Sequence, residues 1–161
     1  MSDTQRILED FKAIIPWVNQ LVELDDAAWF KPIAEGKASI AEIISHLENW
    51  DRYLITKAIP SAQKGEGIVF PDFDPFNTAA YEYARSGISK SQLVGKFCAT
   101  RMELYDLLLE IGEEALRKHV AANGVALCPH TGTPYSVLYI IQEFIEHDLH
   151  HKKQIDHALL R

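Results

Sequence analysis

Apolar residues recur at intervals of three and four positions in four separate stretches, and this helical period restricts the fold more than any other feature of the chain. Thr133 and Pro134 supply an N-cap and a first-turn proline for the last stretch. Serine capping boxes precede the other three, at Ser2–Gln5, Ser39–Glu42 and Ser89–Gln92. The sequence therefore predicts four main helices, each with its own start signal.

The first predicted helix covers about residues 3–24 and contains Pro16, which should break its hydrogen-bond ladder locally. Proline and glycine mark the ends of the next two helices. The second ends at Pro60, the third ends at Gly112, and the fourth runs from Thr133 through a histidine-rich segment to at least Ile155.

No segment alternates with period two over enough residues for a convincing strand, and the best candidate is the short GIVF at 67–70. The chain of 161 residues has the length of one ordinary domain with its own core. We therefore expect residues 1–161 to form a single all-α bundle.

A long connection rich in proline, glycine and aromatic residues, 60–88, joins the second and third helices and is predicted to contain a short helix at about 77–85. Connections of this length are uncommon unless they cross the fold or serve a site. A crossing connection would make the two helices parallel and let its aromatic residues cover one end of the bundle. Ordinary core packing explains these aromatic residues equally well. They are Phe70, Phe73, Phe76 and Tyr81.

The formal net charge of -7 and the scattered basic residues argue against a nucleic-acid partner, because no basic stripe is present. No segment approaches the roughly 18 apolar residues needed to span a membrane. Cys98 and Cys128 are far apart and lack a CxxC spacing, so we expect buried, inert and unpaired thiols. These features predict a cytoplasmic protein.

Four of the seven histidines lie in EHDLHHKKQIDH, residues 146–157. His147 and His151 are four positions apart and therefore project from one face of a helix. Phe144 and Ile155 share that face, so the pair should point into the bundle. The spacing suits two ligands of one metal ion, although histidines on an apolar face can also be core residues with ordinary hydrogen bonds.

His46, at the margin of the apolar face of the second helix, is the candidate third ligand. It lies roughly 10 Å from the start of its helix, and His151 lies roughly 15 Å from the end of the fourth helix. The three imidazoles can therefore meet at similar height if these two helices are antiparallel. A parallel arrangement would separate them by more than a turn.

The other four histidines are expected to lie outside the site. His150 and His157 fall on a polar stripe of the fourth helix, as solvent-facing or supporting residues. His119 and His130 lie in the connection before that helix and are predicted to be surface residues.

Two known metal motifs resemble this pattern but do not fit it. HDLHH is close to the HExxH of zinc proteases with His157 as third ligand, but Gln154 stands where a glycine must turn the chain. Ferritin-like di-iron bundles need Glu-x-x-His pairs, and no histidine here has a glutamate three positions before it. A mononuclear all-histidine site is the better interpretation.

The chain resembles the DinB/YfiT-like superfamily of metal-dependent enzymes over essentially its whole length. The resemblance depends on one histidine in the second helix, in IISHLENW, and on the C-terminal H-x-x-x-H followed by a basic residue, any residue and glutamine. The commoner family ending resembles H-R-G-Q, so Lys153 in place of glycine departs from the pattern and leaves the subfamily open.

The resemblance implies an up-down-down-up four-helix bundle with a long crossover between the second and third helices. It also implies that His46, His147 and His151 bind a divalent ion such as nickel, zinc or iron. Relatives are frequently homodimers, and some are thiol-dependent transferases or isomerases that use low-molecular-weight thiols. The expected substrate is therefore a small molecule.

Three histidine ligands would leave open positions on a metal ion, as in catalytic rather than structural sites. The leading hypothesis is thus hydrolysis or thiol transfer with metal-activated water or thiol. Alternatives are a non-catalytic metal-binding bundle that acts through a protein partner, and a helical scaffold with core histidines. The sequence does not identify a general base or a ligand-orienting carboxylate among four candidates, which are Glu48, Asp51, Glu143 and Asp148.

Overall fold

The computed structural model describes residues 1–160, which form a bundle of helices without a β-strand in that range. The elements are α1 (Asp3–Lys12), α2 (Ile15–Gln20), the 3₁₀ turn η1 (Leu21–Glu23), α3 (Asp26–Phe30), α4 (Ile40–Tyr53), the π-helical turn η2 (Leu54–Ala58), α5 (Ile59–Gln63), α6 (Phe73–Ala84), α7 (Lys90–Ile111), α8 (Glu113–Arg117) and α9 (Val137–Leu159).

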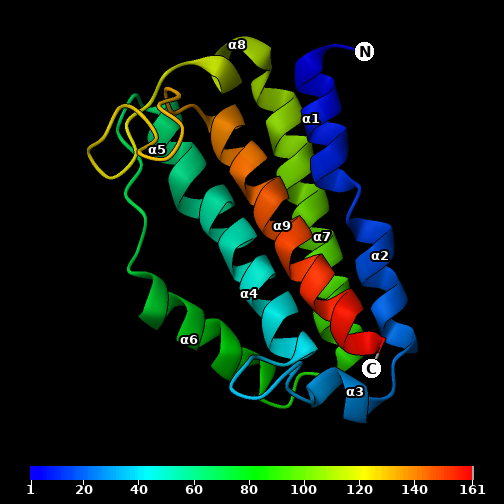
Figure 1. Cartoon of the computed structure of the whole chain (residues 1–161). Coiled ribbons are helices and arrows are strands. Elements are labelled where there is room, and N and C mark those ends of the chain that lie inside the picture. Colours follow the sequence, from blue (N-terminus) through cyan, green and yellow to red (C-terminus); the bar gives the residue numbers. More distant parts are fainter. Residues whose placement is uncertain (161) are drawn as a thin grey trace.

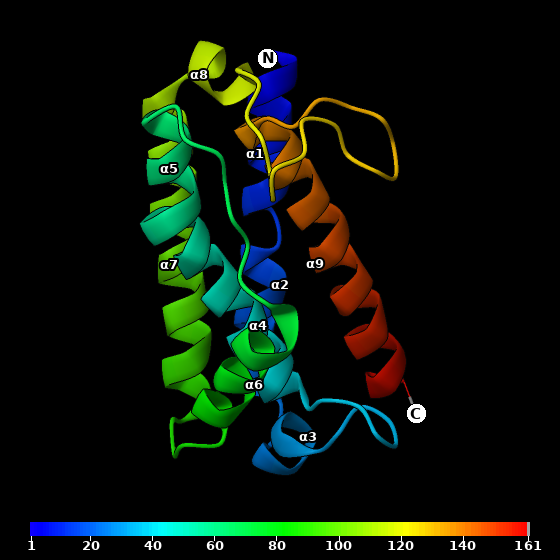
Figure 2. The same ribbon diagram turned by 90° about the vertical axis from the view of Figure 1, so that its left-hand side faces the viewer.

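The four main legs follow the expected up-down-down-up topology. In Figure 1 the chain descends through α1 and α2, rises through α4, crosses back through α6, rises again through α7 and descends through α9. Figure 2 shows the crossover passing down beside α4 before α6 leads to the start of α7. The parallel pair α4 and α7 and the antiparallel pair α4 and α9 are both confirmed.

Local sequence signals explain most helix starts. The side chains of Ser2, Ser39 and Ser89 each accept a hydrogen bond from the third helical residue, and all three predicted capping boxes form. The first predicted helix is divided near Ala13, where α1 ends and Pro16 occupies the first turn of α2. The break predicted at this proline is confirmed.

The predicted end of the second helix is wrong. The helical path continues through Pro60 to Gln63, because the π-helical turn η2 precedes the proline and α5 accepts it in its first turn. The helix in the crossover is also longer than predicted, since α6 begins at Phe73. Ile68 in the GIVF segment forms an isolated bridge with Ala122 instead of a strand.

The predicted start of the last helix is also wrong. Thr133 and Pro134 belong to the preceding loop, where the carbonyl oxygen of Thr133 accepts a hydrogen bond from the Cys128 amide. Helix α9 begins instead at Val137, and the Ser136 side chain caps it by accepting from the Tyr139 amide. Loop pairing thus overrides the favourable Thr-Pro signal.

The apolar core consists of two clusters separated by a polar layer. One cluster joins α1 to the ends of α4 and α7 and the start of α9, and includes Leu54 and Leu108. The other joins α2 and α3 to the starts of α4 and α7 and the end of α9, and includes Ile44 and Ile155. Buried polar and charged residues lie between the two clusters on the three long helices.

Arg101 is the centre of a buried ion cluster in this polar layer. Its fully buried guanidinium donates to both carboxylate oxygens of Asp51 and of Asp148, with shortest distances of 2.6 and 2.7 Å, and to the carbonyl oxygen of Phe11 at 2.9 Å. The Phe11 ring lies 3.8 Å from the guanidinium carbon. These five hydrogen bonds match the five N–H donors of an arginine.

Within residues 1–160, no helix combines the length and apolar character needed to cross a lipid bilayer.

Candidate metal centre

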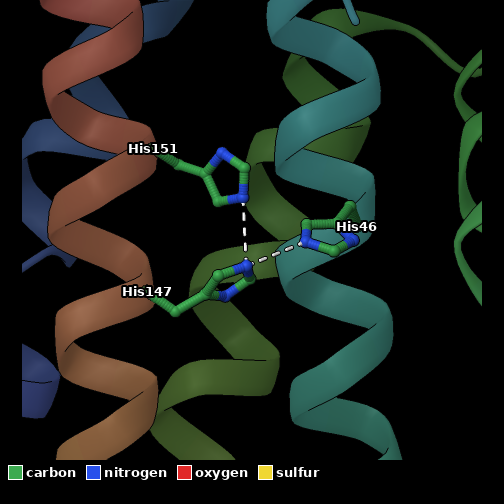
Figure 3. A group of neighbouring side chains, drawn as sticks. All are labelled: His46, His147 and His151. Atoms are coloured by element: carbon green, nitrogen blue, oxygen red, sulfur yellow. Dashed lines mark hydrogen bonds between the residues drawn. The ribbon is translucent and has the colours of Figure 1, made fainter. Parts of the chain in front are cut away.

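The three predicted ligands come together between α4 and α9 (Figure 3). His46 lies in the second turn of α4, and His147 and His151 lie one turn apart on α9. One nitrogen from each ring lies within 4.8 Å of the other two. The antiparallel course of the two helices brings the rings to the same height, as their positions along the sequence predict.

The distances between the ring nitrogens fit a shared metal ion better than mutual hydrogen bonds. Nε2 of His147 lies 3.3 Å from Nε2 of His46 and 3.1 Å from Nε2 of His151. An imidazole Nε2 carries either a hydrogen or one lone pair, so this atom cannot form both contacts as good hydrogen bonds. Nitrogens bound at about 2.0–2.1 Å in a tetrahedral site would lie roughly 3.3 Å apart.

A hydrogen-bond chain through Asn77 determines which His46 nitrogen is free. The Trp50 indole N–H, which can only donate, lies 3.0 Å from Oδ1 of Asn77. That oxygen is therefore an acceptor, and it lies 2.9 Å from Nδ1 of His46, which must carry the hydrogen. The lone pair of His46 is consequently on Nε2, the atom that faces the other two histidines.

Gln154 orients the second ring in the same way. Its Oε1 lies 2.9 Å from Nδ1 of His151, so Nδ1 donates and Nε2 keeps its lone pair. Partners of this kind fix ring orientation in metal sites. Gln154 follows His151 by three positions, so the sequence alone could have identified it as a partner of that ring. Asn77 lies in the crossover helix α6, and its place in the sequence does not connect it with His46.

Burial keeps the imidazoles neutral. Desolvation, with smaller contributions from the neighbouring histidines, lowers the pKa of His46 to about 3 and that of His151 to about 4. Desolvation and then the nearby His150 lower the pKa of His147. Neutral imidazole is the form that binds metal ions, so the site is ready for a cation at neutral pH.

A cavity of about 330 Å³ opens beside His46 and His147. Five of its eleven lining residues are aromatic side chains from α4, α9 and the two long connections; these are Trp50, Phe70, Phe73, Tyr135 and Phe144. Phe76 packs on Trp50, and Tyr81 lies near the His46 ring. Of the aromatic residues of the crossover, Phe70 and Phe73 thus line the cavity and Tyr81 approaches the His46 ring.

The structure separates the four candidate carboxylates. Glu48 accepts a hydrogen bond from Thr100, and Asp51 and Asp148 bind Arg101. Glu143 alone of the four lines the cavity, and desolvation by the cavity walls raises the pKa of its carboxyl group. The expectation that a carboxylate orients a ligand histidine is wrong for His46 and His151, because amides do so.

The remaining histidines lie outside the centre, as predicted. Their side chains are exposed; they are His119, His130, His150 and His157. Both cysteines are unpaired, but Cys98 is only half-buried. Cys128 is buried as expected, and the neighbouring Tyr139 hydroxyl lowers the pKa of its thiol to about 7.

Comparison with known proteins identifies the family of the chain and a protein of similar fold. A sequence model of the DinB superfamily matches residues 17–155, and the chain belongs to that superfamily. The fold is similar to a solved structure described as "YfiT from Bacillus subtilis is a probable metal-dependent hydrolase with an unusual four-helix bundle topology". The two share 14% sequence identity with a TM-score of 0.75, over 98% of this chain and 87% of that one. No match was found among curated protein sequences.

Proposed function

We propose that this chain is a metal-dependent hydrolase of a small molecule, with a divalent transition-metal ion held by His46, His147 and His151. The observation that carries the proposal is the convergence of three Nε2 atoms, two of them with lone pairs fixed by Asn77 and Gln154. Nickel, zinc and iron all accept imidazole ligands of this kind.

The open side of the centre favours catalysis over a structural role. Structural zinc sites are closed by four protein ligands, whereas catalytic sites keep a position for water or substrate. Three histidines converge here, and two of them border the 330 Å³ cavity. A metal ion at this position would act as a Lewis acid and lower the pKa of water toward neutrality.

The residues around the ion would place the substrate and exclude water from it. His46 and His147 line the cavity, so an ion that they hold would be open to the reacting end of a substrate bound there. The aromatic walls would exclude bulk water, which strengthens electrostatic interactions at the centre. The description of YfiT as a probable metal-dependent hydrolase agrees with this proposal for a protein of the same fold.

Thiol transfer is the second candidate reaction, since the same open site would deprotonate a bound thiol. A non-catalytic metal-binding bundle that acts through a protein partner is the third candidate. Assembly as a homodimer and a cytoplasmic location stay predictions.

The test is a substrate screen on protein stripped of metal and then reconstituted with nickel, zinc or ferrous iron. Chromogenic esters and amides report hydrolysis, and an electrophilic dye with cysteine reports thiol transfer. We expect ester or amide turnover that needs metal and is lost in His46→Ala but kept in His150→Ala, which removes an exposed histidine of α9. Equal turnover by metal-free and reconstituted protein would contradict the proposal.

A further inference from the structure

We infer that the cavity beside the histidine centre selects a small cationic molecule, such as an organic ammonium compound, with Glu143 and the aromatic walls binding its positive charge. The inference rests on the proposed function for its claim that this molecule is a substrate. Binding itself can be measured without any turnover.

The aromatic walls provide the first argument. Trp50 lines the cavity, and its ring centroid lies 5.6 Å from that of Phe73 and 6.4 Å from that of Phe144, both nearly perpendicular to it. Phe70 lies 6.2 Å away and Tyr135 completes the lining. Aromatic faces attract an organic cation, and tryptophan does so most strongly.

The charge of the lining provides the second argument. Glu143 contributes an ionisable carboxyl group to the lining of the cavity. The histidines in the lining are neutral, and Tyr135 is a neutral phenol. No lysine or arginine lines the cavity in the part of the chain that the structure describes, so an anionic group would find no countercharge at the rim. Glu143 also lacks an ion-pair partner among residues 1–160.

A cationic group would be repelled by a metal ion at the histidine centre, and the position of Glu143 keeps these two positive charges apart. Glu143 precedes His147 by four residues on α9, which corresponds to one turn or roughly 6 Å along the helix axis. The reacting group could therefore approach His46 and His147 while the cationic group stays one turn away beside the carboxylate. Phe73, which also lines the cavity, has 61% of its surface accessible.

The part of the wall that the two long connections form is fixed before any ligand binds. The backbone amide of Phe70 donates to Oδ1 of Asn123 at 2.8 Å, and the Asn123 amide donates to the carbonyl oxygen of Ile68 at 2.8 Å. Asn123 has a φ of 52°, in the left-handed region that asparagine tolerates better than most residues. The two long connections are thus joined into one rim, which lowers the entropic penalty of binding.

The experiment titrates the zinc-loaded chain with three probes of similar size by calorimetry. Benzyltrimethylammonium is cationic and has no metal-binding group, benzyl alcohol is neutral, and benzenesulfonate is anionic. We expect the cation to bind about tenfold more tightly than either of the others. Glu143→Gln should remove most of that preference while zinc affinity stays unchanged.

Glu146→Gln is the matched control, because it removes the same charge from an exposed residue of α9 that does not line the cavity. The cation preference should survive in this variant. Equal affinities for the three probes, tighter binding of the sulfonate, or equal losses in the two variants would overturn the inference. A Glu143 that acts only as a proton acceptor would leave cation affinity unchanged in Glu143→Gln, which also overturns it.

The outcomes separate this inference from the proposed function. Metal-dependent hydrolysis of neutral esters without any cation preference would keep the proposed function and reject the cationic ligand. If the chain binds neither zinc, nickel nor ferrous iron, the proposed function fails. The same titration on the metal-free chain then decides the inference, because the aromatic walls and Glu143 belong to the chain itself.

Discussion

Two groups of polar side chains interrupt the apolar core midway along the bundle, and they differ in how many of their hydrogen-bonding atoms find partners within the chain. In the ion cluster, Arg101 uses its five N–H donors on Asp51, Asp148 and Phe11. In the histidine centre, the Nε2 atoms of His46 and His151 both carry lone pairs, and a hydrogen on Nε2 of His147 could satisfy only one of them well. Both groups draw side chains from α4 and α9, and the ion cluster adds Arg101 from α7.

The presence or absence of partners for buried polar atoms distinguishes a structural polar cluster from a binding site. A buried charge with complete partners stabilises one arrangement of helices and leaves no atom for a ligand. Buried lone pairs that converge with too few donors are unfavourable until a cation binds them. The ion cluster is therefore expected to determine stability, and the histidine centre is expected to determine metal binding.

The largest expected effect is the loss of the ion cluster. Arg101→Met leaves two buried carboxylates without a countercharge, which should lower the free energy of unfolding by about 3–5 kcal/mol. Arg52→Met is the control, because Arg52 forms partly exposed ion pairs worth about 1 kcal/mol or less. Urea unfolding of both metal-free variants measures the difference. Similar losses would mean that the ion cluster is not the main polar support of the fold.

The second effect is stabilisation by metal. At a free metal concentration about 100 times Kd, binding to the folded state should add about 2.7 kcal/mol to the free energy of unfolding. His46→Leu should abolish that gain and leave metal-free stability similar to wild type, because it replaces an incompletely satisfied buried ring with an apolar side chain. Thermal melts with and without zinc test this, and a retained zinc shift in His46→Leu would contradict the comparison.

The third effect concerns the residue that orients His46. Asn77→Ala removes the acceptor for Nδ1 and should weaken metal affinity about 10–100-fold without preventing binding. Asn49→Ala is the control, since Asn49 also contacts α6 but does not touch a histidine ring. Competition with a chromogenic chelator measures both affinities. Equal affinities would show that Asn77 does not fix the ring.

The smallest effect is in the pH dependence of the metal-free chain. Unfolded histidine titrates near pH 6.5, whereas burial lowers the pKa of folded His46 to about 3. Between these values the unfolded state binds more protons, so this contribution to stability is present above about pH 6.5 and is lost as the pH falls toward about 3.

The pH dependence that comes from the ion cluster has the opposite sign. Burial raises the pKa of folded Asp51 to about 6 despite the opposing effect of Arg101, so a fall in pH below about 6 favours the folded state. His46→Leu isolates the histidine contribution, since the ion cluster is common to both proteins. The variant should lose less stability than wild type between about pH 7.5 and about pH 5. Parallel pH profiles would show that His46 is not buried in the neutral form.

The helices and the three histidines were predictable because their signals are periodic. Ser2, Ser39 and Ser89 start helices through local hydrogen bonds, and His147 and His151 share a face by spacing alone. Arg101 was missed, although it lies four residues after Phe97 on the apolar face of α7, where a charged residue indicates a buried partner. Asn77 could not be found, because its contact with His46 depends on how the crossover packs against α4.

The most direct test of the account is elemental analysis of protein purified without an affinity tag, with His46→Ala and the double variant His147→Ala/His151→Ala measured beside wild type. The account predicts about one first-row transition-metal ion per chain in wild type and its loss in both variants. Wild-type protein without bound metal, even after incubation with nickel and zinc, would contradict it.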